Sequence, residues 1–314
     1  MIMFNYLLIC FIFGTTFLAI KIGVDAAAPP FFSAGLRFFI AGLILFLWMA
    51  AKNKVRFSLL LRKEMLLTGA LLTFGTFSTL YWAEQFVSSG IAAVLSATGP
   101  IMIMLLQIIV LKQSSSTRSI VGCIIGFAGV ILLLMPSLTV SANIWWVIGC
   151  IAILIGEFAY SSGALFSKSV IARFPESSPI ALNAAQMMYG GLLLLVFSMC
   201  TERWHVSYLL EPRALGSLLY LIVIGSMVGH SLFYWLVAKT NPVFPSTWLY
   251  VSPLIALVIG AIFYEETITW VSMLGVVTII AGTIVVNLDN LRQLMRRKSV
   301  AVGRSQKAQN ASNV

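Results

Sequence analysis

The chain carries little charge. Only 10% of its 314 residues are Asp, Glu, Lys or Arg, and 60% are hydrophobic, whereas globular domains carry about 25% charged residues. A soluble fold of this size could not cover so much apolar surface, so lipid must be the solvent for most of the chain. The composition therefore excludes a soluble enzyme and a soluble binding domain.

Residues that carry chemistry in other proteins are also scarce. The two histidines, His205 and His230, lie far apart, and the four cysteines lie inside apolar runs without CxxC spacing. Neither a metal site nor a disulfide framework is predicted. The sequence has no Walker A motif and no Gly-x-Ser-x-Gly turn, so it predicts no direct use of ATP, no cofactor and no enzyme activity. The cysteines are Cys10, Cys123, Cys150 and Cys200.

What the sequence does contain is a series of ten apolar runs. A helix needs about 20 mostly apolar residues to cross a bilayer. The predicted fold is an all-α integral membrane protein with about ten transmembrane helices, and short loops make neighbouring helices antiparallel. The first run lacks the basic region and cleavage site of a signal peptide, so we expect it to remain as a helix. The runs are 3–24, 31–51, 65–86, 90–111, 119–135, 145–167, 180–200, 214–237, 245–264 and 269–288.

The loop charges predict the orientation. The formal net charge is +10, and the basic residues concentrate in alternate loops and in the C-terminal tail. Loops rich in Lys and Arg stay in the cytoplasm. We therefore expect a multi-pass protein of a bacterial plasma membrane, with both termini in the cytoplasm and no nucleic-acid partner. The basic residues of these loops are Lys52, Lys54, Arg56, Arg62, Lys63, Lys112, Arg118, Lys168, Arg173 and Lys239.

The chain also repeats itself. A shift of 153 positions matches residues of the first half with identical residues of the second half, without a gap. Each half holds five predicted helices, and because five is odd, the two halves must enter the membrane in opposite directions. Inverted repeats are the plan of many secondary transporters, whose substrate site lies between the halves. The matched pairs include Ser78 and Ser231, Tyr81 and Tyr234, Trp82 and Trp235, Pro100 and Pro253, Gly122 and Gly275, and Gly129 and Gly282.

This duplication predicts three units. Residues 1–138 form the first five-helix repeat, and residues 139–290 form the second. Residues 291–314 are expected to be a basic cytoplasmic tail without fixed structure, because they are polar and rich in Lys and Arg.

Several short motifs stand in the apolar runs: Gly14–Lys21, Pro29-Pro30, Leu36-Arg37-Phe38, Tyr81-Trp82-Ala83, Thr98-Gly99-Pro100, Ser252-Pro253 and Glu265-Glu266. Together they resemble the EamA branch of the drug/metabolite transporter superfamily, over about positions 1–290. The resemblance implies ten helices in two inverted repeats and carrier-mediated export or exchange of metabolites. The sequence departs from the family pattern at Lys112, where the second half has Glu265.

The leading hypothesis is a secondary transporter that exports small amino-acid-like or drug-like solutes by alternating access, with proton coupling as one option. A nucleotide-sugar or phosphate-ester antiporter is an alternative, but it needs several basic groups at one cavity, and only Lys21 and Arg37 are candidates. A membrane-embedded enzyme or a sensor is a further alternative, although the sequence offers neither a polar catalytic cluster nor a soluble signalling domain.

Ionisable groups inside a membrane span cost about 2.5–3.5 kcal/mol on insertion scales and are functional candidates by default. Glu157 lies near the middle of the sixth run, and a carboxyl away from water protonates more readily, as a reversible proton site requires. A structural hydrogen bond is the alternative role. His230 in the eighth run is expected either to bind substrate or to be a core histidine with its hydrogen bonds satisfied.

The other candidates are weaker. Glu84 is expected to face water near the outer end of the third run, and structural roles are favoured for Lys21 and for Arg37, which could pair with Asp25. Asn183 and Gln186 are explained by hydrogen bonds between helices. Aromatic residues placed by the repeat, and others near them, are candidates for a cavity wall: Tyr81, Trp82, Tyr160, Tyr234, Trp235, Trp248 and Tyr250. Pro100 and Pro253 are candidates for kinks that form the site or gate it.

Overall fold

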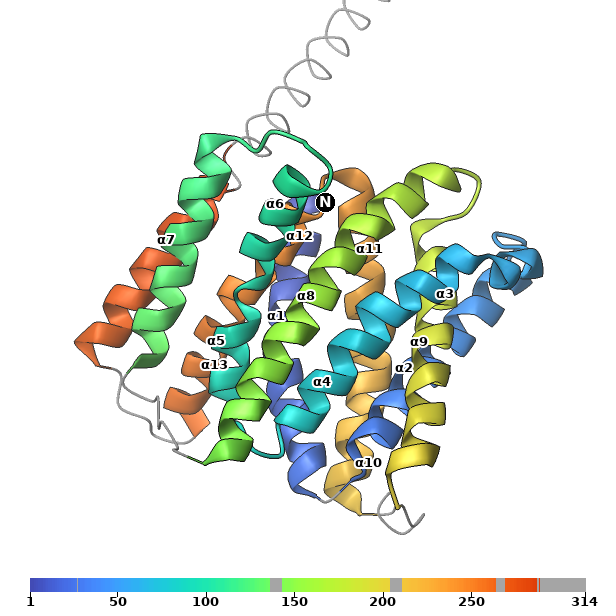
Figure 1. Ribbon diagram of the computed structural model, residues 1–314, viewed down its shortest axis with the longest axis horizontal. Coiled ribbons are helices and arrows are strands. Elements are labelled where there is room, and N and C mark those ends of the chain that lie inside the picture. Colours follow the sequence, from blue (N-terminus) through green and yellow to red (C-terminus); the bar gives the residue numbers. More distant parts are fainter. Residues whose placement is uncertain (27, 136–142, 204–210, 264–268, 287, 289–314) are drawn as a thin grey trace, which may run out of the picture.

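The structure is a computed structural model that describes residues 1–26, 28–135, 143–203, 211–263, 269–286 and 288. Within these ranges every regular element is a helix, and the helices pack side by side in one bundle (Figure 1). The tail 291–314, His205 and the Glu265-Glu266 pair lie outside the described residues.

The helices form ten segments, in agreement with the predicted fold. Seven of them are long and apolar enough to cross a membrane, and the fifth, ninth and tenth are shorter apolar helices. The segments are α1 (Ile2–Asp25), α2 (Pro30–Ala51), the third helix (α3, Lys63–Gly69, to α4, Thr76–Ala83), the fourth (α5, Ser89–Ser96, and α6, Gly99–Ile109), α7 (Thr117–Leu134), α8 (Ile144–Arg173), α9 (Pro179–Thr201), the eighth (α10, Pro212–Tyr220, to α11, Ser231–Lys239), the ninth (α12, Val243–Ser246, and α13, Trp248–Phe263) and the tenth (Trp270–Val286).

The helix faces divide between lipid and core. On α8, Ile148, Ile151, Ile155 and Phe158 are 38–60% exposed and recur every three or four residues, which is the spacing of one helix face. Glu157 lies on the buried side of the same helix. A large apolar stripe facing outward is what a bilayer requires and what water would penalise.

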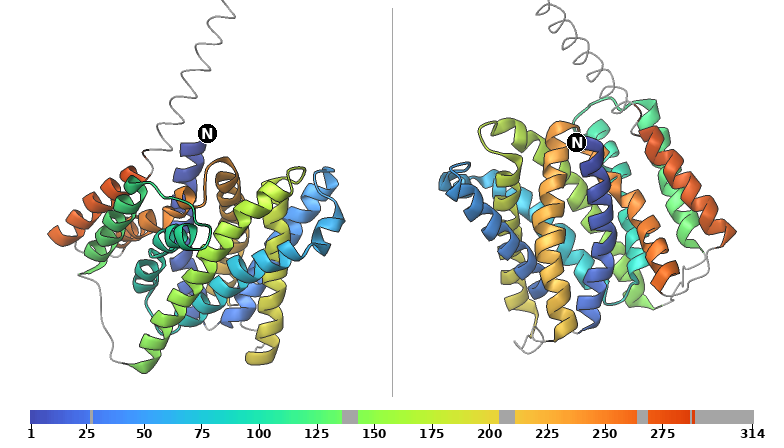
Figure 2. Two further views of the ribbon diagram at one scale, coloured as in Figure 1. Left: turned by 45° about the horizontal axis from the view of Figure 1, so that its top comes forward. Right: turned by 180° about the vertical axis from the view of Figure 1, so that it is seen from behind.

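The halves are inverted repeats. Gly122 of α7 lies against Gly282 of the tenth helix, and Gly129 lies against Gly275. The 153-residue shift pairs Gly122 with Gly275 and Gly129 with Gly282. Exchanging the two helices therefore turns the contact between Gly122 and Gly282 into the contact between Gly275 and Gly129. Such a contact needs a two-fold axis between the helices, and because they run antiparallel, this axis lies in the membrane plane. Both views of the ribbon show the pair side by side at one edge of the bundle (Figures 1 and 2).

Two lysines show the same symmetry at opposite ends of the bundle. Lys21 Nζ donates to the backbone carbonyl of Glu84 over 2.9 Å, at the end of the third helix. Lys168 Nζ donates to the carbonyls of Val237 and Thr240 over 2.9 and 3.0 Å, at the end of the eighth helix. Positions 84 and 237 are again 153 residues apart. Each lysine therefore satisfies carbonyls that a helix end leaves without partners.

The expectation that Arg37 pairs with Asp25 is wrong, because Asp25 pairs with Lys21 over 2.9 Å. Glu84 does not face water, since it is fully buried. Pro100 stands in the first turn of α6, directly after the interruption between α5 and α6, whereas Pro253 lies inside α13. The four cysteines are free, and Cys10 and Cys123 are buried.

Candidate functional site

A small cavity with a volume of about 40 Å³ lies between the two halves. Its walls come from the first five helices and from the second five alike, so the cavity occupies the place where inverted-repeat transporters bind substrate. The lining residues are Phe13, Thr16, Phe17, Ile20, Arg37, Leu72, Thr76, Phe77, Leu80, Ser96, Glu157, Tyr160, His230, Phe233, Tyr234, Trp248 and Leu249.

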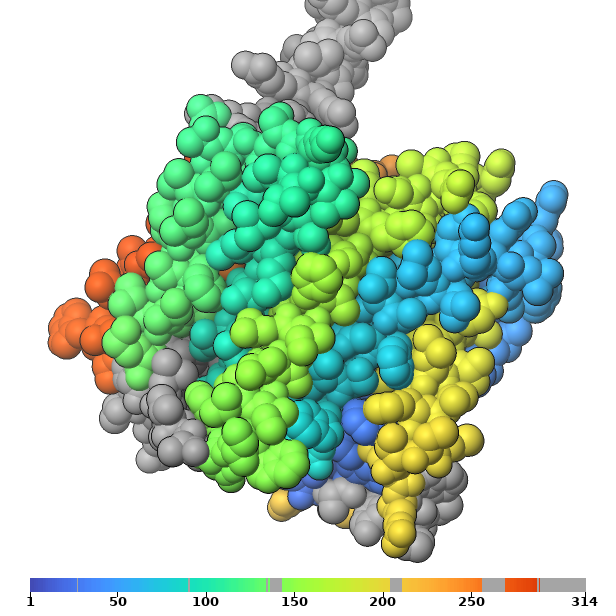
Figure 3. Space-filling model, viewed as in Figure 1, coloured from blue at the N-terminus to red at the C-terminus, as the bar shows by residue number. Residues whose placement is uncertain are grey.

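The cavity is closed on one side by α8. This helix runs between α4 on one flank and α5 and α6 on the other (Figure 3). The cavity side of α8 carries Glu157 and Tyr160, three residues apart and so on one helix face. Both side chains are more than 90% buried.

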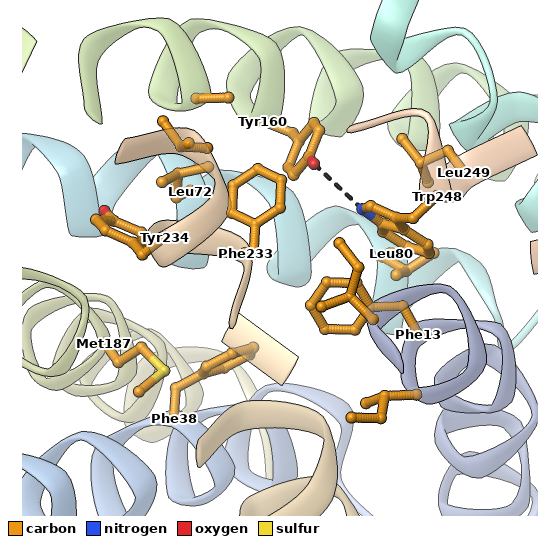
Figure 4. Close-up of a cluster of buried hydrophobic side chains, with 14 of the residues drawn as sticks. Phe13, Phe38, Leu72, Leu80, Tyr160, Met187, Phe233, Tyr234, Trp248 and Leu249 are labelled. Carbon is orange, nitrogen blue, oxygen red and sulfur yellow. Dashed lines mark hydrogen bonds between the residues drawn. The ribbon is translucent and has the colours of Figure 1, made fainter. Parts of the chain in front are cut away.

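Aromatic rings form most of the apolar wall. The ring of Phe13 packs against Trp248 with centroids 4.6 Å apart and against His230 at 5.1 Å. Trp248 Nε1 donates to the hydroxyl of Tyr160 over 3.4 Å, which ties α13 to α8 across the cavity (Figure 4). Offset and edge-on ring contacts of this kind hold a wall in one shape while leaving ring faces open to an apolar ligand.

Three buried polar atoms of the cavity make no hydrogen bond of normal geometry among the residues that the structure describes. They are Ser96 Oγ, Glu157 Oε2 and Tyr234 OH, and the Ser96 hydroxyl lies close enough to the Glu157 carboxyl to interact with it. All three residues line the cavity. Buried polar atoms are paired in the great majority of cases, and an unpaired one costs about 1–3 kcal/mol. A polar ligand in the cavity would remove this cost.

The carboxyl of Glu157 also lies against the interrupted fourth helix. A Cβ added to Gly99, the first residue of α6, would lie only 2.8 Å from Glu157 Oε2. Ser161, one turn further along α8, donates to the carbonyl of Gly99 over 3.2 Å. The N-terminal end of a half-helix carries partial positive charge, so the start of α6 favours a negative group at this place.

Arg37 is the cation of the cavity. It is 1% exposed, and its Nε donates to Ser226 Oγ over 2.8 Å while Nη1 donates to the hydroxyl of Tyr81 over 3.2 Å. The guanidinium stands over the rings of Phe38 and Phe77 at 4.6 and 5.1 Å. Within the described part of the chain, no carboxylate lies within ion-pair distance of it.

The sequence led us to favour a structural role for Arg37. Its position in the middle of α2, inside the span, was the signal for a cavity residue, since a charge at that depth is a functional candidate by default. Ser96 and the phenylalanines of the wall were not singled out at all. Serine and phenylalanine are common in membrane helices, so residue type alone does not distinguish a cavity position from a packing one.

Five of the candidate residues, Glu157, His230, Tyr160, Tyr234 and Trp248, line the cavity. The other four lie elsewhere. Tyr81 receives a hydrogen bond from Arg37, behind the wall. Trp82 lines a separate pocket of about 660 Å³ at the ends of the first three helices and of α9, together with Gln85 and Glu202.

The remaining two aromatic candidates, Trp235 and Tyr250, lie outside the cavity lining as well. Trp235 is partly buried against the main core. Tyr250 is fully buried against Gly126, and its hydroxyl donates to the carbonyl of Cys123 over 3.2 Å. The repeat therefore relates pairs of residues whose surroundings differ between the halves.

The amides Asn183 and Gln186 hydrogen-bond between helices, as expected. Gln186 accepts from Thr73 over 2.9 Å and donates to Asn183 over 3.1 Å. Glu84 is different, because both of its carboxylate oxygens are buried without a hydrogen-bond partner among the described residues. It does not line the cavity, so it offers a matched carboxyl outside the site.

The chain was compared with known proteins. The model of the EamA-like transporter family matches residues 1–135 and 147–288. The uncharacterised inner membrane transporter YedA of Escherichia coli K12 is 28% identical over 284 residues, which cover 88% of this chain and 87% of that protein. A protein of Salmonella typhimurium named as a probable amino-acid metabolite efflux pump is 26% identical over 286 residues, covering 89% and 92%.

A solved crystal structure has the same fold. It superposes with a TM-score of 0.72 at 17% sequence identity, and the alignment covers 91% of this chain and 96% of the other. At this identity the likeness concerns the path of the chain and not the contents of the site.

Proposed function

The chain belongs to the EamA-like transporter family, and from this premise we propose that it is a secondary carrier that exports small amino-acid-like solutes by alternating access. It is a multi-pass membrane transporter, as its relatives' names and its apolar helices indicate. In the proposed cycle the two inverted halves expose the central cavity to one side of the membrane at a time.

One observation carries the proposal of a small polar substrate. Three different residues, Ser96, Glu157 and Tyr234, each contribute to this cavity a buried polar atom that no hydrogen bond of normal geometry satisfies. Elsewhere in the described core such atoms belong to Glu84 and Thr283, which do not line the cavity. A binding site retains the three cavity atoms because the substrate completes their hydrogen bonds.

The charges of the cavity suggest the kind of solute. Arg37 offers a guanidinium that suits a carboxylate, and Glu157 offers a carboxyl that suits an ammonium group. The remaining wall is largely apolar and aromatic, which suits an apolar side chain. An α-amino acid with an apolar side chain carries these three features together. The Salmonella relative named as an amino-acid metabolite efflux pump supports the same class.

The nucleotide-sugar and phosphate-ester alternative finds less support. A phosphate group is best held by several basic side chains. Among the described residues, Arg37 is the one Lys or Arg that lines the cavity, and Lys21 is engaged with Asp25 and with the carbonyl of Glu84. A single guanidinium fits a carboxylate better than a doubly charged phosphate.

Glu157 is the proposed proton-coupling residue. It is 6% exposed, lies on the cavity side of α8 and has an oxygen without a partner. A carboxyl in this position can bind either a proton or the ammonium group of the solute, but not both. Such competition for one group is what proton-driven antiport needs.

The test uses the purified carrier in proteoliposomes with radiolabelled leucine and phenylalanine. Counterflow into vesicles preloaded with the unlabelled amino acid measures exchange, and accumulation after a pH step measures coupling. Glu157→Gln mimics the protonated state and removes the partner of the ammonium group, so we expect it to lose the pH-driven accumulation and to keep only weakened exchange at equal pH.

Glu84→Gln is the matched control, since Glu84 is an equally buried carboxyl that does not line the cavity. We expect it to retain the pH response. Counterflow that is absent in the wild type would refute the carrier proposal for these solutes. Accumulation that persists in Glu157→Gln would assign coupling to another group, and a wild type without any pH response would make the protein a facilitator.

A further inference from the structure

Each half contains one helix with a π-helical segment. The third helix is interrupted at Ala70–Gly75, and the eighth helix at Leu221–His230. The 153-residue shift places 70–75 on 223–228, inside the second segment. A π-helical turn widens the helix and disturbs its hydrogen-bond ladder, and such turns are frequent at functional sites and at bends. The repeat therefore places one deformable point in each half.

Each π-helical segment is held from the opposite half by a single polar side chain. Arg37 of α2 donates to Ser226 over 2.8 Å, and Gln186 of α9 accepts from Thr73 over 2.9 Å. Thr73 and Ser226 are 153 residues apart. Arg37 and Gln186 are 149 residues apart, and each stands seven residues after the proline that begins its helix, Pro30 and Pro179 respectively, so the two side chains hold matching places on α2 and α9. One contact has thus been duplicated with the repeat.

The two copies differ in what else they touch. Gln186 belongs to a closed network, because it also donates to Asn183, which donates to Ser231 over 3.5 Å. Neither amide lines the cavity. The hydrogen bond between Gln186 and Thr73 of the third helix is therefore not exposed to a ligand in the cavity.

Arg37 instead lines the cavity, and its two hydrogen-bond acceptors are the neutral hydroxyls of Ser226 and Tyr81. A buried cation is poorly compensated by neutral acceptors. A carboxylate accepts two parallel hydrogen bonds from a guanidinium and neutralises its charge, so it is a much better partner than a serine hydroxyl. An anionic ligand in the cavity would compete directly with Ser226.

We propose that the carboxylate of a bound solute displaces Ser226 from Arg37 and so releases the π-helical segment of the eighth helix, while Gln186 keeps the third helix in place. Binding is then coupled to bending in one half. Ser226 is a positioning residue that acts through Arg37. The inference rests on the proposed function, because it takes the carboxylate from the proposed amino-acid-like substrate.

The segment itself carries part of the cavity wall. His230, its last residue, lines the cavity, and its ring packs against Phe13 and Phe77 at 5.1 and 5.8 Å. A bend in this segment would therefore change the shape of the wall next to Arg37. This gives the released segment a direct effect on the cavity.

Hydrogen–deuterium exchange of the full-length protein in lipid nanodiscs tests the inference. We expect Ser226→Ala to raise exchange in 221–230 by about 10- to 150-fold without ligand, the range that one hydrogen bond to a charged group supplies. Thr73→Ala is the matched control and should raise exchange in 70–75 only. Ser226→Thr restores a hydroxyl of the kind found at position 73 and should return exchange to the wild-type rate.

Leucine and leucinamide then separate the carboxylate from the rest of the ligand. Leucine should raise exchange in 221–230 of the wild type, and leucinamide, which lacks the carboxylate, should not. Leucine counterflow without any change in 221–230 would overturn the inference and leave the proposed function intact. An unchanged exchange rate in Ser226→Ala would overturn it as well. Absence of counterflow would refute the proposed function and with it the ligand step.

Discussion

The close contact between α7 and the tenth helix requires glycine, and Gly282→Ala tests this requirement most directly. A Cβ at position 282 would lie 2.6 Å from Gly126 Cα and 2.9 Å from the carbonyl oxygen of Gly122. Both atoms belong to the backbone, so no side chain can move aside. Since ordinary carbon contacts are about 3.5–4.0 Å, the two helices must separate by about 1 Å at this point.

The magnitude follows from two opposing terms. Forcing extra atoms into a packed interior costs about 1–3 kcal/mol. Alanine is favoured over glycine in a helix by about 0.5–1 kcal/mol, because glycine loses more backbone freedom on folding. The net effect is a destabilisation of about 1–2 kcal/mol, which corresponds to a decrease of about 1.5–3 °C in Tm for a chain of this size.

Gly216→Ala is the matched control. A Cβ at position 216 in α10 would meet nothing within 4 Å, so only the favourable helix term remains. We expect the Tm of this variant to be unchanged or higher by up to about 2 °C. Thermal unfolding of the purified variants in one detergent, followed by intrinsic fluorescence, measures both. Equal Tm changes in the two variants would refute the argument that backbone contact sets the distance between α7 and the tenth helix.

Two further predictions follow from the fold. Lys168→Met removes the donor that holds the carbonyls of Val237 and Thr240, and should lower Tm by about 4–9 °C, since two hydrogen bonds to a charged group contribute about 1.5–3 kcal/mol each. Lys168→Arg should keep most of the stability, and a Tm of the Met variant equal to wild type would contradict the role. Reporter fusions at Asn143 and at the C-terminus should report opposite sides of the membrane, with the C-terminus in the cytoplasm, because the basic loops alternate; activity on one side for both fusions would refute this topology.

The helix count and the duplication could be read from the sequence for simple reasons. A span in lipid must satisfy its backbone internally and must be apolar over about 20 residues, so it leaves a long run in the sequence. The glycines that let α7 and the tenth helix touch are also visible, because a fixed contact preserves residue type and spacing in both repeats. Glu157 stood out because an ionisable group inside a span is costly.

The contents of the cavity were decided by the tertiary structure. Tyr81 and Tyr234 are equivalent in the repeat, yet Tyr234 faces the cavity and Tyr81 holds Arg37. Which face of a helix meets a ligand depends on the rotation of that helix and on the neighbours that cross it. Because a helix in lipid is apolar on its lipid-facing side and on its core-facing side alike, hydropathy does not distinguish the two faces. The π-helical segments are hidden for a related reason. Their contacts with Arg37 and Gln186 join residues far apart in the chain, and such contacts leave no local signal at the segment itself.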